Sequence, residues 1–259
     1  MNMKPTAHSC VGIPAAAMLL EEVSHRQPTD VAEGVATLRI AISDVFARAM
    51  PPETTDVAPV TIVVAGPALQ VITSPVASLR PLGLDITSDV VTAPSDDLAL
   101  AAKVDAIQVA ALTGDAAIMA LQVQEALGSA VGIRVLEVPG DLAEARLNAL
   151  ADRLAHHVPG HVVVAADLAA TLSEASPGYL TPGADDWDQA IVECLSAPAD
   201  ERERALAHSG PADAEHFGAR GWMPLRVLSR VAAQRDQTLT VFAYEAPRGV
   251  GQVVVGPAR

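Results

Sequence analysis

The feature of this sequence that most constrains its fold is a set of apolar runs of strand length. The clearest is Val60 to Ala65, where apolar residues follow one another with little polar alternation. His161 to Ala166 is similar, and Val131 to Val138 also has the length and composition of a strand. Strands that are apolar on both sides are typical of parallel sheets covered by helices on both faces. These runs therefore predict a central sheet buried within an α/β protein.

Helical patterns alternate with these runs. After Asp30 and Glu33, which have the spacing of a capping box, apolar residues recur on one helical face, at Val35, Leu38, Ile42, Val45 and Ala49. Further helices are expected from Ser95 to about Gly114, from Asp115 to about Gly128, and from Asp141 to His157, where Asp141 and Glu144 repeat the capping-box spacing. Strands are expected at residues 9–13 and around residues 84–91. This alternation predicts an α/β fold with a mainly parallel central sheet flanked by helices.

The last third of the chain has a different pattern. A loop rich in Pro and Gly runs from Ser176 to Gly183, and two or three helices are expected between Asp185 and Gln234. Thr238 to Ala246 and Val250 to Val255 then predict a C-terminal antiparallel hairpin. No linker or repeat divides the chain, so residues 1–259 are predicted to form a single domain.

Charge and composition exclude several classes of partner. The net charge is −14, from 31 acidic and 17 basic residues, and such a surface repels nucleic acid and anionic membranes. No apolar run approaches the ~18 residues of a membrane span, and the N-terminal region is a poor match to a signal peptide. We therefore expect no nucleic-acid or membrane partner and a cytoplasmic location. Cys10 and Cys194 are expected to be buried free thiols.

Common catalytic and nucleotide-binding motifs are absent from the sequence. The turn after Val60–Ala65 is Gly66-Pro67-Ala68-Leu69, which is not the glycine-rich loop of a dinucleotide-binding fold. The chain also has no phosphate-binding P-loop and no G-x-S-x-G nucleophile elbow. A Rossmann oxidoreductase, a P-loop enzyme and an α/β hydrolase are therefore disfavoured.

Three segments in the C-terminal part resemble one known family in order and spacing. They are Ser176 to Asp188 (S-P-G-Y-L-T-P-G-A-D-D-W-D), Gly218 to Leu228 (G-A-R-G-W-M-P-L-R-V-L) and Glu245 to Gly251 (E-A-P-R-G-V-G). Together they resemble class III extradiol dioxygenase B-subunit-like proteins. The resemblance implies an α/β fold. In active members of the wider superfamily it also implies Fe(II) or another divalent metal held by two His and a carboxylate, with a further His as acid and base.

The residues expected from this resemblance are largely missing. The metal-binding His residues are expected just after the first strand and after Val60–Ala65, where this chain has Pro14 and Gly66-Pro67. The acid–base His is expected at the end of a turn whose place is taken here by Ala166-Asp167-Leu168-Ala169-Ala170, which contains no His, and Trp222-Met223 stands near the expected carboxylate. A site without its two His ligands has no evident way to hold its metal, so no metal or other cofactor is predicted.

Three hypotheses follow from these observations. The first is a catalytically degenerate dioxygenase-fold protein that binds a small molecule or a protein partner. Its cleft would lie beyond the carboxyl ends of the parallel strands, lined by Pro14, Gly66, Pro67 and Asp167. Asp167 is expected either to face that cleft or to cap the turn that follows it.

The second hypothesis is an active metal-dependent enzyme, an extradiol-type dioxygenase or another kind. It would bind Fe(II) or another divalent metal through non-standard ligands such as His8, Asp167 and Glu245. The third is a subunit role, in which an apolar helix face mediates homo-oligomer formation (Trp222, Leu225, Val227, Leu228 and Val231). At helical spacing such a face more often belongs to the core.

Overall fold

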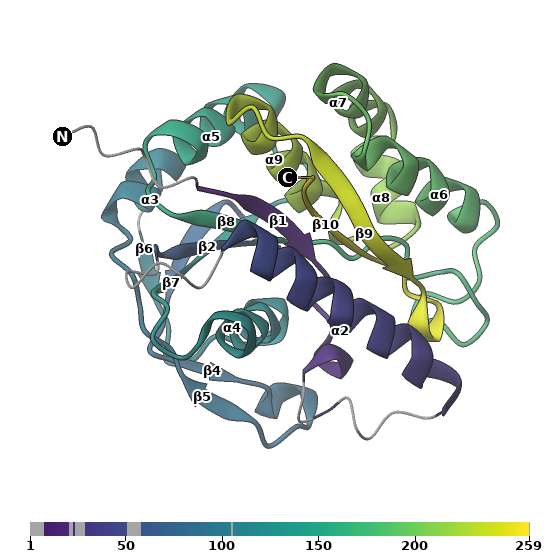
Figure 1. Ribbon diagram of the computed structural model, residues 1–259, viewed down its shortest axis with the longest axis horizontal. Helices are drawn as coiled ribbons and strands as arrows, with labels where there is room; N and C mark the ends of the chain where they lie inside the picture. Colours follow the sequence, from purple (N-terminus) through teal and green to yellow (C-terminus); the bar gives the residue numbers. More distant parts are fainter. Residues whose placement is uncertain (1–7, 21–22, 24–28, 51–57, 105, 259) are drawn as a thin grey trace.

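A mixed eight-stranded sheet forms the centre of the protein in the computed structural model, which describes residues 8–20, 23, 29–50, 58–104 and 106–258 (Figure 1). The strands lie in the order β6-β3-β7-β2-β8-β1-β10-β9. Their bounds are β1 (Cys10–Ile13), β2 (Val60–Ala65), β3 (Gln70–Thr73), β6 (Ala106–Gln108), β7 (Ile133–Val138), β8 (His161–Ala165), β9 (Leu239–Glu245) and β10 (Gln252–Pro257). A separate pair is made by β4 (Val76–Ser78) and β5 (Thr87–Asp89).

Four adjacent strands, β7, β2, β8 and β1, run parallel, and they are the apolar segments that predict the sheet. Val60, Ile62 and Val63 of β2 are all fully buried. The outer strands depart from this direction, since β3 is antiparallel to β7 and β10 is antiparallel to β1. β9 and β10 form the C-terminal antiparallel pair. The predicted α/β fold with a mainly parallel sheet and a C-terminal hairpin is confirmed.

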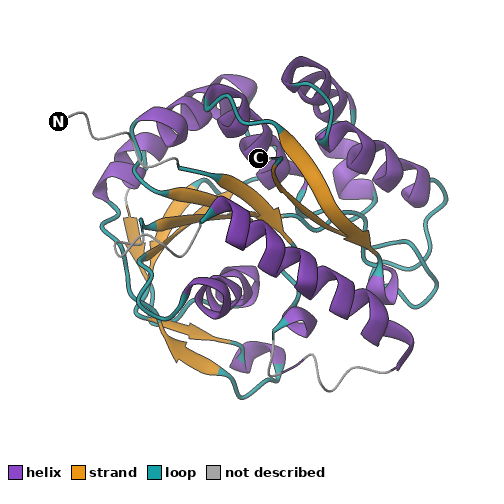
Figure 2. Ribbon diagram, viewed as in Figure 1, coloured by secondary structure: helices purple, strands orange, loops and turns teal. Residues whose placement is uncertain are grey.

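Helices cover both faces of the sheet (Figure 2). α2 and α4 pack on one face, while α3, α5 and α9 pack on the other, and α6 to α8 lie beside α9 and β9. Their bounds are α2 (Thr29–Ala49), α3 (Asp96–Ala102), α4 (Gly114–Leu127), α5 (Glu144–His156), α6 (Ala184–Leu195), α7 (Ala199–His208), α8 (Pro211–His216) and α9 (Trp222–Gln234). Three short 3-10 helices complete the description: η1 (Ala17–Leu19), η2 (Arg80–Leu82) and η3 (Pro247–Gly249). No helix in the described ranges combines the length and the hydropathy that a membrane crossing requires.

The segment between residues 84 and 114 differs most from its prediction. The predicted helix from Ser95 ends at Ala102, and the short strand β6 follows it. The predicted strand at residues 84–91 contains only the three residues of β5. Both differences have the same reason: β5 and β6 are strands of three mostly exposed residues, which carry no periodic apolar pattern, so tertiary pairing decides their structure.

Helix starts and the helical C-terminal region also differ in detail. α5 begins at Glu144 after Ala143, and no side-chain hydrogen bond caps it, so the predicted capping box at Asp141 is wrong. Asp141 lies too far before the first turn to reach the free N–H groups. The side chain of Asp30, the other predicted cap, lies outside the described residues. Four helices rather than two or three lie between Asp185 and Gln234, because α7 and α8 are short.

The apolar face of α9 belongs to the core. Its residues are almost completely buried, with exposed fractions of 2% for Trp222 and 0% for Leu225, Leu228 and Val231. The hypothesis that this face forms an interface between subunits is therefore wrong. The face packs on the sheet and on α5 and α7, as helical spacing more often means.

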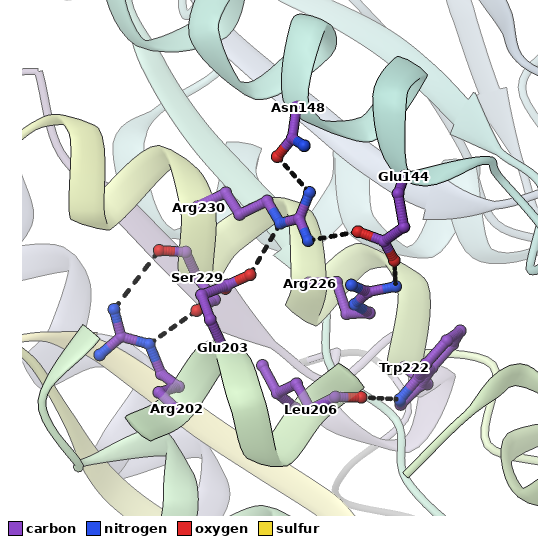
Figure 3. A network of polar contacts seen from close by, with 9 residues as sticks. All are labelled: Glu144, Asn148, Arg202, Glu203, Leu206, Trp222, Arg226, Ser229 and Arg230. Atoms are coloured by element: carbon purple, nitrogen blue, oxygen red, sulfur yellow. Dashed lines mark hydrogen bonds and ion pairs between the residues drawn. The ribbon is translucent and has the colours of Figure 1, made fainter. Parts of the chain in front are cut away.

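A network of charged side chains ties α9 to α5 and α7 (Figure 3). Glu144 of α5 pairs with Arg226 and Arg230 of α9, each at 2.6 Å. Arg230 also pairs with Glu203 of α7 at 2.7 Å. In α7, Arg202 is 1% exposed and donates to Ser229 Oγ at 2.8 Å. The helices on this face are thus held together by ion pairs and hydrogen bonds between charged side chains as well as by apolar contacts.

Candidate functional site

The carboxyl ends of β1, β2 and β8 meet at one edge of the sheet. The three strands are parallel neighbours in register, with Ile13 opposite Ala165 and Val63 opposite Val164. The residues that follow them, Pro14, Gly66 and Asp167, therefore share the same edge. Ligands of open α/β sheets commonly bind at such an edge. The structure thus brings these predicted cleft residues to one end of the molecule.

Asp167 is the partly exposed acid at the centre of this edge. Its Oδ2 accepts a hydrogen bond from the backbone N–H of Ala15 at 3.0 Å. Its carbonyl oxygen accepts one from the N–H of Gly221 at 2.7 Å. A Cβ atom on Gly221 would lie 2.4 Å from that carbonyl oxygen, so only glycine allows this close approach. The Asp167 side chain therefore caps the turn after β1 rather than the turn that follows Asp167 itself.

The electrostatic surroundings of Asp167 raise the pKa of its carboxyl group. Burial raises its pKa to about 7, and the neighbouring Asp115 acts in the same direction. The hydrogen bond from Ala15 and the charge of Arg220 oppose this shift. Asp115, at the start of α4, forms an ion pair with Arg220 at 2.8 Å, and burial raises the pKa of Asp115 as well. The edge thus holds two carboxyl groups with raised pKa values and one paired guanidinium.

A buried amide lies directly beside Asp167. In the sheet, β1 lies between β8 and β10. Beyond the carboxyl end of β1, the segment that follows β8 lies directly beside β10, and Asp167 stands opposite Gln252 in an antiparallel bridge. Leu168 N–H donates to the carbonyl of Gly251, and Val253 N–H donates to that of Ala166. These bonds flank Asp167 and Gln252, which makes them a non-hydrogen-bonded pair with closely spaced side chains. Gln252 is 2% exposed, and its Oε1 has no hydrogen-bond partner.

Glu245 extends this arrangement by one strand. It lies opposite Gln252 in the β9–β10 ladder, so the two side chains point to the same face of the sheet. Its Oε2 lies 3.4 Å from the position that a Cβ of Gly34 in α2 would take. Asp167, Gln252 and Glu245 therefore form a row across three chain segments, which we call the acidic row. Sequence reasoning singled out the two acids but not Gln252, Asp115 or Arg220.

The other predicted cleft residues, Pro14, Gly66 and Pro67, are explained by packing and carry no polar side chain. Pro14 is buried and Pro67 is exposed. A Cβ at Gly66 would lie 2.6 Å from Cβ of Glu137, so the glycine accommodates the Glu137 side chain. The Glu137 carboxylate in turn accepts a hydrogen bond from Gln70 at 2.5 Å. Neither proline nor glycine offers a side-chain donor to a metal.

His8 lies at the opposite edge of the sheet. Its ring stacks edge-on against His161, the first residue of β8, with ring centroids 6.1 Å apart. Burial lowers the pKa of His161 to about 4, and its Nδ1 accepts the N–H of Ser9 at 3.1 Å. The length of β8, roughly 17 Å for its five residues, separates His8 from Asp167. The structure therefore does not bring His8, Asp167 and Glu245 together.

The residues at the carboxyl edge do not fit a divalent-metal centre of the expected kind. Such a centre needs two His and a carboxylate. The positions expected for the His ligands hold Pro14 and Gly66-Pro67, and Asp115 is already paired with Arg220. Within the described ranges, no three His, Cys, Asp or Glu side chains are grouped so that they could hold a metal ion.

The residues of the family-like segments pack against one another close to the site. Asp188 accepts the N–H of Ala169 at 2.8 Å through Oδ1 and the hydroxyl of Tyr244 at 2.8 Å through Oδ2. Ser176 Oγ donates to the carbonyl of Gly249 at 2.9 Å. A Cβ at Gly251 would lie 1.9 Å from Asp188 Oδ2. These residues thus position the loop that carries Asp167 and the start of β10.

A separate pocket of about 270 Å³ lies away from this edge. It is lined by the C-terminal half of α4, β5 and Leu20, and Gln124 is its buried polar residue. Gln124 Nε2 already donates to the carbonyl of Asp89 at 2.6 Å. The carboxyl edge has the denser collection of charged groups, so we take it as the candidate site.

The fold and the site together define an α/β protein with a polar site at the carboxyl edge of a mixed sheet. No family model matches the chain, and no curated protein matches it in sequence. Among solved structures, the chain is similar to an uncharacterised protein, JW3007, from Escherichia coli K12. The TM-score is 0.62 at 11% identity, and the match covers 97% of this chain and 100% of the other. This similarity supports the fold as one unit.

Proposed function

We propose that this protein is a dioxygenase-fold protein that has lost the metal chemistry of its relatives and binds a small polar molecule at the carboxyl edge. The observation that carries the proposal is the composition of that edge. Pro14 and Gly66-Pro67 stand where the metal-binding His residues are expected. The segment 166–170, in the place of the turn that carries the acid–base His, contains no His, and burial raises the pKa of its Asp167 to about 7.

The packing of the family-like segments supports the same proposal. Asp188, Ser176 and Gly251 hold loops in place, and none of these contacts requires a metal or a substrate. A structural role explains why these residues resemble those of the dioxygenase family although the metal ligands of that family are absent. The site itself keeps charged and hydrogen-bonding groups, which is typical of a binding site for a polar ligand.

Metal content tests the first half of the proposal. The protein would be purified without chelator, and its Fe, Mn and Zn would be measured by elemental analysis for the wild type and Asp167→Asn. We expect far less than one equivalent of each metal and no difference between the two proteins. One equivalent of metal in the wild type that is lost in Asp167→Asn would overturn the proposal in favour of a metal-dependent enzyme.

Ligand-induced stabilisation tests the second half. A ligand that binds only the folded state raises the midpoint of thermal unfolding. We would screen cationic, neutral and anionic small polar molecules against the wild type, Asp167→Asn and Asp186→Asn, an exposed position that matches the change in charge. We expect at least one class to stabilise the wild type and Asp186→Asn but not Asp167→Asn. Equal responses from all three proteins would contradict a site at Asp167.

A further inference from the structure

The acidic row is lined by hydrogen-bond acceptors. Asp167 and Glu245 contribute carboxylates, and Gln252 between them contributes an amide oxygen without a partner. A buried acceptor that lacks a donor is unfavourable by about 1–3 kcal/mol, so native structures seldom leave one without a reason. The donor that this oxygen lacks is what a ligand could supply.

The geometry of the row defines how such a ligand would approach. Asp167 and Glu245 are partly exposed, whereas Gln252 is buried between them. Neighbouring strands lie about 4.8 Å apart, so the Cα atoms of Asp167 and Glu245 are separated by roughly two strand spacings. A ligand bound between them would meet the amide oxygen at the centre of the row and a carboxylate on each side.

The charges around the row favour a cation. Arg220 neutralises Asp115, but the described residues provide no ion-pair partner for Asp167 or Glu245. The protein as a whole carries a net charge of −14, which raises the local concentration of cations. A metal ion is a poorer fit than an organic cation, since the described His, Cys, Asp and Glu side chains form no metal-binding group.

We infer that the acidic row binds the protonated amino group of a small organic amine. The ammonium donates hydrogen bonds to the Asp167 carboxylate and to Gln252 Oε1, and a second amino group can reach Glu245. An ammonium group has three N–H donors and no acceptor, so it complements the two carboxylates and the amide oxygen of Gln252. This inference rests on the proposed function, because it names the ligand class of the same site.

Calorimetric titration with three matched probes tests the inference. At pH 8 and low ionic strength, 1,4-diaminobutane, butylamine and the neutral butanol would each be titrated into the protein. We expect saturable binding of both amines with one site, tighter for the diamine, and none of butanol. No saturable binding of either amine up to about 20 mM, well above a millimolar Kd, would overturn the inference.

Variants connect any binding to the row. Asp167→Asn removes a charge, and Gln252→Met removes the amide from a side chain of similar length. We expect each to weaken amine binding at least tenfold, while Asp186→Asn leaves it unchanged. Circular dichroism would verify that each variant is folded, and Asp167→Asn alone suffices if the change at the buried Gln252 prevents folding. Undiminished binding in Asp167→Asn would place the amine elsewhere and overturn the inference.

The inference and the proposed function fail in distinguishable ways. If a neutral or anionic molecule stabilises the wild type and loses its effect in Asp167→Asn, while amines do not bind, the ligand class is wrong and the binding function stands. If one equivalent of metal is present and depends on Asp167, the proposed function is wrong, and the inference built on it fails too.

Discussion

At the scale of single residues, the site depends on the carboxyl group of Asp167 and on the close backbone contact of Gly221, and a substitution at either residue is expected to alter the site. Asp167 holds its carboxyl group partly out of water beside a second acid, and Gly221 allows a backbone approach that no other residue permits. The two meet directly, because Gly221 N–H donates to the Asp167 carbonyl. The backbone of Asp167, which carries the side chain, can therefore take its position only because residue 221 has no Cβ atom.

The raised pKa of Asp167 predicts how stability changes with pH. A carboxyl group whose pKa rises from 3.8 to about 7 on folding contributes stability fully below pH 3.8. This contribution is lost as the pH rises through about 7. Asp167→Asn removes it, so the variant should lose less stability between pH 5 and pH 8 than the wild type, by about 1–2 kcal/mol after allowance for solvent screening.

Urea unfolding of both proteins at the two pH values measures this difference. Asp188, whose pKa is raised to about 6, remains in both proteins and cancels in the comparison. Identical pH dependence in the wild type and the variant would show that Asp167 is ionised throughout this range.

The variant Gly221→Ala tests the close approach of residue 221 to the backbone of Asp167, because it adds the missing Cβ atom. The new Cβ would lie 2.4 Å from the carbonyl oxygen and 2.5 Å from the nitrogen of Asp167, both backbone atoms that cannot rotate away. We expect a loss of at least about 2 kcal/mol in the free energy of unfolding. Gly140→Ala is the matched control, because nothing lies within 4 Å of its Cβ position. A loss below about 0.5 kcal/mol at Gly221 would contradict the tight packing there.

At the scale of elements, Asp188 joins three parts of the chain. It lies on α6, accepts the N–H of Ala169 in the loop after β8, and accepts the hydroxyl of Tyr244 on β9. It is 0% exposed. The resemblance to a known family drew attention to Asp188, but sequence reasoning could not assign its role. Its partners lie 19 and 56 residues away, and only the folded chain brings them together.

Asp188→Ala should therefore destabilise the protein. The change leaves the buried Ala169 N–H and the partly buried Tyr244 hydroxyl without this acceptor, which predicts a loss of about 2–4 kcal/mol. Asp188→Asn keeps one carbonyl oxygen, so it should lose less. Thermal and urea unfolding check the order wild type, Asn variant, Ala variant. Equal stability of the two variants would mean that volume rather than hydrogen bonding determines the effect.

At the scale of the whole molecule, ion pairs between side chains connect the helices of the layer that contains α9. The side chains of Arg226 and Arg230 are 4% and 13% exposed, whereas that of Glu144 is 59% exposed. The acid thus reaches from the surface to two cations that are largely buried (Figure 3). Removing the acid would leave Arg226 charged and poorly solvated.

Glu144→Ala should lower the free energy of unfolding by about 1–2 kcal/mol. Part of the loss should diminish as salt screens the remaining cations. Urea unfolding at low and high salt measures both effects. Glu174→Ala, an exposed position outside the network, provides the control. If the two variants had the same stability, the network would contribute nothing beyond surface charge.

The sequence predicts the parts of this molecule that a local pattern encodes. The long buried strands β2, β7 and β8 and the helices α2, α4 and α5 have such patterns, and their apolar residues form the core. β3 and β6 have three or four residues and depend on pairing, so no pattern indicates them. In the site, the edge position of Asp167 follows from β8. Gln252, Asp115 and Arg220 come from distant segments, and their convergence is a property of the fold.

The pairing of β1 has a consequence for how the chain reaches this fold. β1 lies between β8 and β10, and Gly12 stands opposite Val255. Until β10 is in place, one hydrogen-bonding edge of this fully buried strand has no neighbour, and such edges invite association with other chains. Because this contact joins residues so distant in sequence, its closure carries a large entropic barrier. Completion of the sheet, and of the acidic row that depends on β10, is thus expected to come late and in one cooperative step.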